Sequence, residues 1–150
     1  MENVFNNDFK EFIRCLNNAK VEYMLVGGYS VILYGYGRTT GDMDVWVNKS
    51  KENLINLKKA CLEFGLPTND LTEQNFLENE DLDVFTFGRP PVCIDIMNKL
   101  KGVAFSDAFQ NSVIMEVDGG PVRVIAKNDL IKAKLSSNRP KDQDDLLHLK

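Results

Sequence analysis

The chain has 150 residues, of which 43% are hydrophobic, and this is enough material for one ordinary hydrophobic core but too little for two. Its 18 Lys and Arg residues against 22 Asp and Glu give a net charge of −4, which argues against a protein that holds nucleic acid through an extended basic surface. We therefore expect a single domain over residues 1–150.

The cysteines and the N-terminal residues restrict the cellular setting. Cys15, Cys61 and Cys93 are far apart and lie among apolar neighbours, which indicates buried thiols in a reducing compartment. The segment MENVFNNDFKEF is acidic and amphipathic without a continuous apolar run, so we expect neither a signal peptide nor a membrane span. The sequence thus predicts a cytoplasmic protein without a membrane partner.

The order of hydrophobic patterns and turn signals predicts alternating helices and strands. The first helix carries Phe9, Phe12 and Leu16 on one face, with Asp8 as its expected N-cap. In chain order we expect a helix over 8–18, a strand over 21–26, a helix over 29–36, a strand over 43–47, a helix from an N-cap at Ser50 to about Phe64, a short helix over 74–78, strands over 83–87 and 92–97, a helix over 103–111, a hairpin of strands over 113–117 and 122–125, and helices beginning at Asn128 or Asp129 and at Lys141. This order predicts a mixed α/β (α+β) fold, in which helices flank one mixed β-sheet.

Acidic side chains stand out at two points of the predicted sheet. Asp42 and Asp44 flank one apolar residue at the start of a strand, so their carboxylates should leave the same face of it, roughly 7 Å apart along the chain. A D-x-D pair alone is most often turn chemistry. Asp95, however, lies in the apolar run PVCIDIM, where a carboxylate must be paired, bound to a metal or placed at the solvent end of the strand. Together the three acids predict a metal site.

A glycine turn lies close to these acids in the sequence. Gly27 and Gly28 follow the strand over 21–26 directly, and residues without a Cβ let the backbone approach a phosphate closely. The helix that begins there would add free N–H groups and a favourable dipole. We expect Gly27, Gly28 and the Ser30 hydroxyl to hold phosphates, with Arg38 reaching the same place unless it is a solvated loop residue.

These residues resemble the signature of the nucleotidyltransferase superfamily that includes DNA polymerase β. The resemblance rests on Val26-Gly27-Gly28, on Asp42-Met43-Asp44-Val45 after thirteen intervening residues, and on Ile94-Asp95-Ile96. With the late segment NDLIKAKLSSNRPKDQDDLLHL, the chain is similar to small prokaryotic members of the abortive-infection and minimal-nucleotidyltransferase kind. The resemblance implies the polymerase β-like fold and an enzyme that transfers a nucleoside monophosphate from a nucleoside triphosphate, expected to be ATP, to a hydroxyl with release of pyrophosphate.

The chemistry of this transfer explains the residue types. Two Mg²⁺ ions about 3.5–4 Å apart can offset negative charge on the attacking and leaving sides, and carboxylates hold them. The resemblance makes Asp42 and Asp44 the bridging ligands. It makes Asp95 the ligand on the acceptor side and a candidate for taking the acceptor's proton. Lys134 lies where similar proteins carry a basic residue towards the triphosphate, and it reads equally well as an exposed helical lysine.

The charged residues near the C-terminus indicate a function less clearly than the acids of the predicted sheet. Asp142, Asp144 and Asp145 read as charges in the first turn of a helix, although Asp142 also recurs in the resemblance without a clear chemical role. His148, beside two leucines, is expected to pack or to face solvent.

The acceptor is open at the level of the sequence. It is a partner protein, as in toxin–antitoxin pairs, an RNA end, which the acidic net charge disfavours, or a small molecule such as an aminoglycoside or lincosamide. The resemblance implies that larger members, which modify antibiotics or add nucleotides to RNA, carry a substantial further domain, so the acceptor site of this chain could be completed by a second copy or by another protein. The alternatives to a transferase are a non-catalytic nucleotide-binding or interaction protein of such a pair and, less favoured for want of histidines, a metal-dependent phosphohydrolase.

Overall fold

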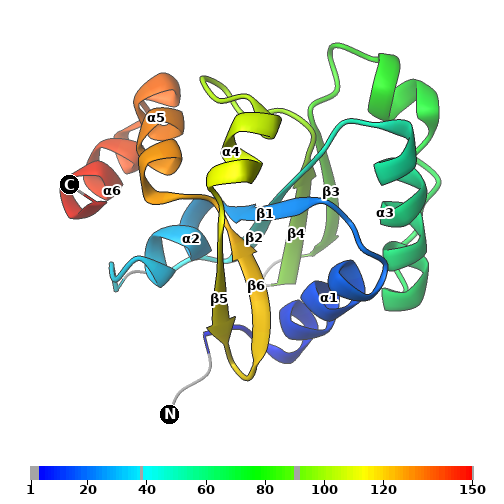
Figure 1. The fold of residues 1–150 in the computed structure, drawn as a ribbon, viewed down its shortest axis with the longest axis horizontal. Helices are drawn as coiled ribbons and strands as arrows, with labels where there is room; N and C mark the ends of the chain where they lie inside the picture. Colours follow the sequence, from blue (N-terminus) through cyan, green and yellow to red (C-terminus); the bar gives the residue numbers. More distant parts are fainter. Residues whose placement is uncertain (1–3, 38, 90–91, 150) are drawn as a thin grey trace.

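One mixed sheet organises the chain. The computed structural model describes residues 4–37, 39–89 and 92–149. Within these residues lies a six-stranded sheet in the order β3-β4-β2-β1-β6-β5, with helices packed around it (Figure 1). The expected mixed α/β class is confirmed.

The elements follow the order that the sequence predicts. The strands are β1 (Tyr23–Val26), β2 (Asp42–Val47), β3 (Val84–Arg89), β4 (Val92–Met97), β5 (Val113–Val117) and β6 (Gly120–Val124). The helices are α1 (Asn7–Asn18), α2 (Gly27–Leu33), α3 (Lys51–Phe64), the π-helix η1 (Gln74–Glu78), α4 (Phe105–Asn111), α5 (Lys127–Ser137) and α6 (Pro140–Leu149).

Strand β2 lies at the centre of the strand pairing that positions the acids. It runs antiparallel to β1 and parallel to β4, while β3 pairs with β4 in an antiparallel register. In these registers Asp44 is opposite both Val26 of β1 and Asp95 of β4. The sheet therefore brings together two acids that are far apart in the sequence.

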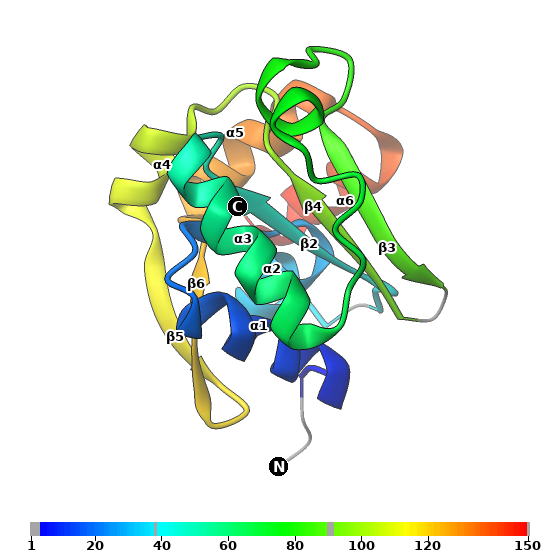
Figure 2. The same ribbon diagram turned by 90° about the vertical axis from the view of Figure 1, so that its right-hand side faces the viewer.

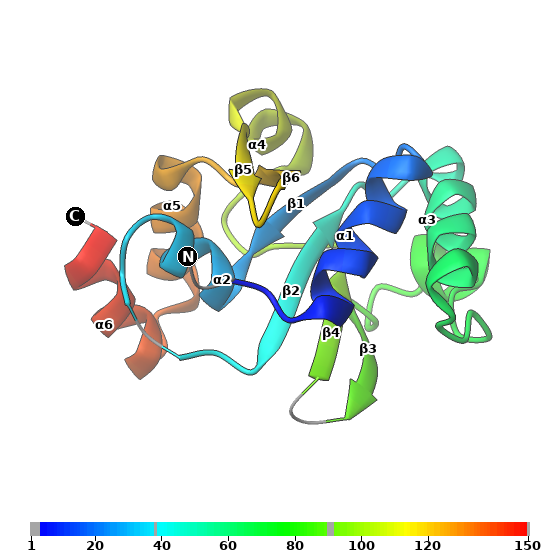
Figure 3. The same ribbon diagram turned by 90° about the horizontal axis from the view of Figure 1, so that it is seen from below.

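The two faces of the sheet bury different sets of side chains. Helices α1 and α3 lie over one face, in front of the sheet in Figure 2, and cover a core that includes Leu25, Val45 and Ile96. On the other side lie α4, α5 and α6, and the smaller core there includes Met24 and Trp46. Figure 3 shows the sheet between these two groups of helices. Because side chains alternate along β2, Asp42 and Asp44 share the second face with Trp46.

Helix termini differ in detail from the expected ones. Asn6, rather than Asp8, caps α1 by accepting a hydrogen bond from the Phe9 N–H at 2.8 Å. Helix α5 begins at Lys127, one residue before the earlier of its two expected starts, Asn128 and Asp129. The short helix over Gln74–Glu78 has the expected bounds but is a π-helix. Ser50 and Gly65 cap α3 as expected, and Gly65 adopts the left-handed conformation with φ of 99°.

The cysteines are free and buried, as the sequence predicts. Burial raises the pKa of Cys15 to about 11 and that of Cys61 to about 12, so neither thiol is reactive at neutral pH. No helix among the described residues has the length and apolar character needed to cross a membrane.

Removal of the Phe9 ring should cost a large share of the stability. Phe9 is fully buried on α1 and packs edge to face on Tyr29 with ring centroids 5.5 Å apart. We expect Phe9→Ala to lower the free energy of unfolding by about 3–5 kcal/mol in urea titrations. Leu62→Ala on α3 is the control, because Leu62 is 67% exposed and its loss should cost less than about 0.5 kcal/mol. Equal losses would contradict the packing of α1.

Candidate active site

The glycine turn and the second acid of the D-x-D pair are in direct contact. Gly27 has φ of +67°, a conformation that favours glycine, and a Cβ built on it would lie 2.8 Å from Asp44 Cγ and collide with Oδ2. The carboxylate of Asp44 thus packs on the bare backbone of Gly27. Any larger residue at position 27 must move this carboxylate or change the turn.

The third acid lies beside this pair. Asp95 is paired in register with Asp44 across β2 and β4, and both are half-buried, whereas Asp42 is exposed at the first residue of β2. On the other side of Asp95, the Thr86 hydroxyl of β3 donates a hydrogen bond to Asp95 Oδ1 at 2.8 Å. Thr86 thereby orients the carboxylate, a contact that the sequence did not predict.

The electrostatics of this face centre on Asp44. Burial, followed by the negative charges of Asp95 and Asp42 and a hydrogen bond with Asp95, raises the pKa of Asp44 to about 7, while Lys141 opposes the shift. Clustered carboxylates repel one another in this way, and one of them then holds a proton more tightly. Strongly shifted acids of this kind are typical of functional sites.

The donor set of this face fits a hard divalent cation. Mg²⁺ takes carboxylate oxygens, and its charge would relieve the repulsion that raises the pKa of Asp44. As the side chains stand, no group of three or more His, Cys, Asp or Glu residues in the described part of the chain is arranged to hold a metal ion. The assignment of Asp42, Asp44 and Asp95 as metal ligands therefore stays a prediction.

The other residues expected to hold phosphates lie in different environments. Ser30 is fully buried and donates a hydrogen bond to the Gly27 carbonyl at 2.6 Å, so its hydroxyl holds the turn, and its contact with a phosphate stays a prediction. Gly28 is buried at the start of α2. Arg38 lies outside the described residues.

Lys134 is neither exposed nor free. Its side chain is 7% exposed, and its Nζ lies 3.3 Å from Asp142 Oδ1 and 2.9 Å from Asp145 Oδ2. Both acids are buried on α6, so Lys134 joins α5 to α6 through an internal ion pair. Asp142 lies in the first turn of α6 as expected, but the burial of Asp142 and Asp145 against Lys134 was not predicted.

Asp142 lies at the centre of the buried ion-pair network that it forms with Lys134 and Asp145. It accepts hydrogen bonds from Ser137 Oγ at 2.8 Å and from Arg139 Nε and the Arg139 backbone N–H at 2.8 and 3.0 Å. Burial by itself would raise the pKa of Asp142, but the hydrogen bonds from Arg139 and Ser137 and the charge of Lys134 hold it well below its usual range. The carboxylate is ionised at all physiological pH values and fixes the Arg139 guanidinium.

A cavity of about 110 Å³ lies between the glycine turn and this network. Its lining includes Gly27, Lys101, Lys134, Ser137 and Arg139. The hydrogen bond to Asp142 and the charge of that carboxylate, and after them the charges of Asp44 and Asp145, raise the pKa of Arg139, which places its guanidinium within electrostatic range of the acids. No role for Lys101, Arg139 or Lys141 was predicted from the sequence; the RPKD run contains Arg139 and Lys141, but no pattern indicated Lys101.

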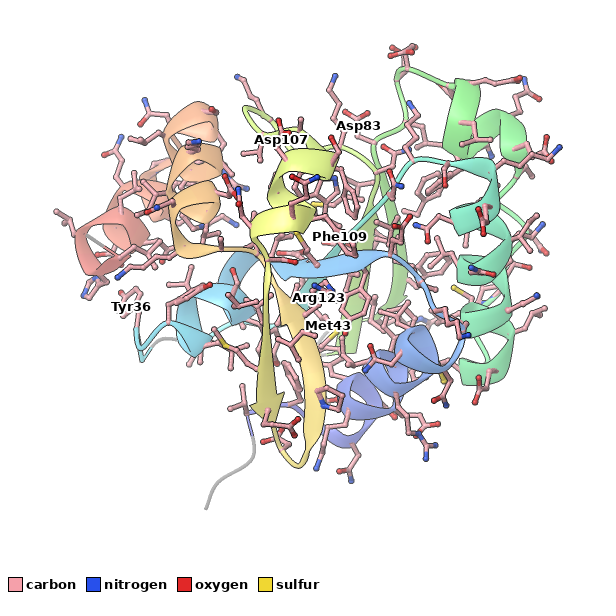
Figure 4. The ribbon with its side chains drawn as sticks, in the orientation of Figure 1. Tyr36, Met43, Asp83, Asp107, Phe109 and Arg123 are labelled. Carbon is pink, nitrogen blue, oxygen red and sulfur yellow. The ribbon has the colours of Figure 1, made fainter. Side chains whose placement is uncertain are left out.

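Aromatic contacts anchor α6 beside the turn that follows α2. The rings of Tyr36 and His148 stack with centroids 3.6 Å apart, and the Tyr36 hydroxyl donates to Asp144. Figure 4 places Tyr36 at the edge of the molecule, far from Arg123 and Phe109 near its middle. His148, which was expected to pack or to face solvent, does both, because it stacks on Tyr36 and is exposed. Trp46 is a core residue, edge to face with Phe105 at 5.1 Å.

A family model matches nearly the whole chain, over residues 7–149. The family is described as nucleotidyltransferase of unknown function (DUF6036), and the chain belongs to it. This confirms the nucleotidyltransferase superfamily. A search of curated proteins finds no match.

Solved structures share the fold at low sequence identity. The lincosamide antibiotic adenylyltransferase LnuA, solved with lincomycin, is 14% identical, with a TM-score of 0.64 over 99% of this chain and 98% of its own. A nucleotidyltransferase-like protein, TM1012 from Thermotoga maritima, is 15% identical, with a TM-score of 0.65 over 93% of this chain and 88% of its own. The antibiotic-resistance factor ANT(2'')-Ia is 14% identical, with a TM-score of 0.61 over 95% and 80%. The polymerase β-like fold is thus shared with antibiotic-modifying enzymes.

The raised pKa of Asp44 predicts a pH-dependent stability. The folded pKa of about 7 lies above the unfolded value of 3.8, so the native state is favoured while Asp44 is protonated and loses this stability as the pH rises from about 4 through 7. Asp44→Asn should therefore raise the free energy of unfolding at pH 8 by about 1–3 kcal/mol and change it little at pH 4. Urea titrations at both pH values check this.

A matched substitution elsewhere controls for the lost charge. Asp81 is exposed, and Asp81→Asn should have no such pH-dependent effect. A gain for Asp44→Asn that is the same at pH 4 and pH 8 would contradict the repulsion among the acids.

Loss of the Lys134 cation should destabilise the packing of α5 on α6. Lys134→Met leaves the buried Asp142 and Asp145 without their shared cation, and removing one partner of a buried ion pair costs about 3–5 kcal/mol. Lys132→Met is the control on the same helix, because Lys132 is 67% exposed, and it should change stability by less than about 0.5 kcal/mol. Equal unfolding temperatures for the two variants would contradict a stabilising role of the Lys134 ion pairs.

Proposed function

We propose that the chain is an active, Mg²⁺-dependent nucleotidyltransferase that transfers a nucleoside monophosphate from a triphosphate, with ATP the expected donor, to a hydroxyl. The observation that carries the proposal is the packing of the Asp44 carboxylate on Gly27, with Asp95 beside it on β4. This contact joins the element suited to phosphates to the acids suited to a divalent cation.

The donor phosphates would lie over Gly27, at the mouth of the cavity that Gly27 shares with Arg139 and Lys101. Asp142 holds Arg139 through a two-point hydrogen-bond pair, with Nε at 2.8 Å and Nη2 at 3.2 Å, so the guanidinium is oriented before a ligand arrives. Arg139 remains half-exposed and able to meet a phosphate oxygen. Lys134 would act indirectly, by holding Asp142.

The three acids would serve the reaction from the other side of Gly27. Mg²⁺ held by Asp42, Asp44 and Asp95 would neutralise charge on the phosphates and the attacking oxygen when bound. In the transfer, the acceptor oxygen bonds to the α-phosphorus, the bond from that phosphorus to the bridging oxygen of pyrophosphate breaks, and the acceptor's proton passes to the Asp95 carboxylate. The Thr86 hydroxyl keeps Asp95 turned towards the incoming oxygen.

The acceptor would approach from the β3 side of the acids. Thr86 and Val84 are exposed on the same face of the sheet as Asp95, and Val84 is 43% exposed. The α5–α6 pair lies on the donor side (Figure 1). An open strand edge beside Asp95 leaves room for a bulky acceptor or for a second protein chain.

The comparison with LnuA bears on the size of the acceptor. The further domain was expected of larger members, and the solved LnuA chain, described as a lincosamide antibiotic adenylyltransferase, is covered over 98% by this chain. A small hydroxyl-bearing molecule is accordingly a full candidate for the acceptor, alongside a partner protein and an RNA end.

Label transfer tests the proposal. The protein is incubated with Mg²⁺ and each α-labelled triphosphate in a lysate of its host, and the labelled product is sorted into protein, RNA and small-molecule fractions. We expect one fraction to gain label. Asp44→Asn should reduce the transfer at least about a hundredfold, because even residues that only support metal ligands are worth 10–100-fold.

Asp81→Asn, which removes an exposed acid far from the glycine turn in sequence, is the matched control and should keep full activity. Full activity of a folded Asp44→Asn variant would overturn the mechanism. Absence of transfer and of nucleotide binding would favour the interaction protein of a toxin–antitoxin-like pair, and labelled nucleoside diphosphate or monophosphate as sole product would favour a phosphohydrolase.

A further inference from the structure

A second, larger cavity lies on the opposite face of the sheet from the acids. It measures about 360 Å³ and is enclosed by α1 and the β5–β6 hairpin, whose tip lies beside α1 in Figure 1. Val122 in its wall belongs with Met43 and Val45 to the core beneath α1 and α3. Because Asp42 and Asp44 alternate with those two β2 residues, they face the other way.

Fixed contacts hold the walls of this cavity in place. The Asp118 carboxylate at the hairpin tip accepts hydrogen bonds from the Val4 and Phe5 N–H groups at 2.9 and 2.8 Å. Further along α1, the Asn17 side-chain amide donates to the Pro121 carbonyl at 2.9 Å. The helix and the hairpin are therefore joined at two points, and the space between them is a built feature of the fold.

The lining combines an apolar interior with positive charge. Phe5, Ile13, Val117 and Val122 are buried apolar residues of the wall. The charged groups that line the cavity are Lys10, Arg14 and Asp118; Arg14 is paired with Glu11, and Asp118 is engaged by backbone amides.

Lys10 is the cation without such a partner. No ion pair joins it to an acid within the part of the chain that the structure describes. Its ammonium group is therefore available to an anion in the cavity.

We propose that this cavity binds a small amphipathic anion, with an apolar body against Val117 and Val122 and a carboxylate on Lys10. The volume of about 360 Å³ lies at the lower end of the 300–1,000 Å³ typical of ligand pockets, which suits a compact molecule better than a helix or strand of a partner. The apolar body gains from leaving water, and the carboxylate gives selectivity against neutral and cationic molecules of the same shape. This site is separate from the proposed transferase site and does not depend on it.

Calorimetric titration with sodium octanoate tests the site, with n-octylammonium as the probe of matched length and opposite charge. Octanoate should bind the wild-type protein, and n-octylammonium should bind at least about tenfold more weakly, a difference of about 1.4 kcal/mol. Saturation with Mg²⁺ and ATP should leave the octanoate affinity unchanged, because the two sites lie on opposite faces.

Gly120 offers a way to block the cavity without disturbing the core. It lies in β6 on the same side as Val122, and a Cβ at this position meets no atom within 4 Å. Gly120→Ile places a β-branched residue, which strands accept well, into the open space and should weaken octanoate binding at least about tenfold. Lys10→Gln should weaken it about two- to fivefold, as expected for a partly exposed charge pair.

The unfolding temperatures of both variants establish that they fold. Three results would overturn the proposal: no binding of octanoate to the wild type, equal binding of n-octylammonium, or undiminished octanoate binding by a folded Gly120→Ile variant.

Discussion

The contact between the Asp44 carboxylate and the backbone of Gly27 is the constraint on which the candidate site depends. It requires a residue without Cβ, a left-handed backbone at the end of β1 and a strand pairing that sets Val26 opposite Asp44. The parallel pairing of β2 with β4 sets Asp95 on the other side of Asp44. One local contact thus fixes the position of Asp44 beside the third acid, where the proposed phosphate and cation would bind, and the pKa of this carboxylate is raised to about 7.

The buried charges of α5 and α6 lie across the cavity from Gly27 and form the other wall of the candidate site. Lys134 between Asp142 and Asp145 gains little net stability from burial, because desolvation offsets most of the attraction. What the network supplies is geometry: Asp142 holds Arg139, and Arg139 lies within electrostatic range of Asp44. The acids and the cations are therefore brought together by different means, strand register on one side and an internal ion pair on the other.

Much of this could be predicted from the sequence, because local signals were strong. The alternation in DMDVWV, the apolar run around Asp95 and the caps at Ser50 and Gly65 are read from neighbouring residues alone. The contacts of Ser30, Lys134 and Asp142 could not be predicted because they come from three-dimensional packing: Ser30 turns back onto Gly27, and Lys134 faces acids on another helix. The hydrogen bond from Thr86 to Asp95 also depends on a strand register that no local pattern encodes.

Calorimetric titration of the protein with α,β-methylene ATP at pH 8, with and without Mg²⁺, tests the central claim most directly. We expect the nucleotide to bind with Mg²⁺ and to bind more weakly without the cation. A folded Gly27→Ala variant should not bind the nucleotide, because the added methyl group displaces the Asp44 carboxylate. Absence of nucleotide binding by the wild type, or unchanged binding by folded Gly27→Ala, would contradict the assignment of the site.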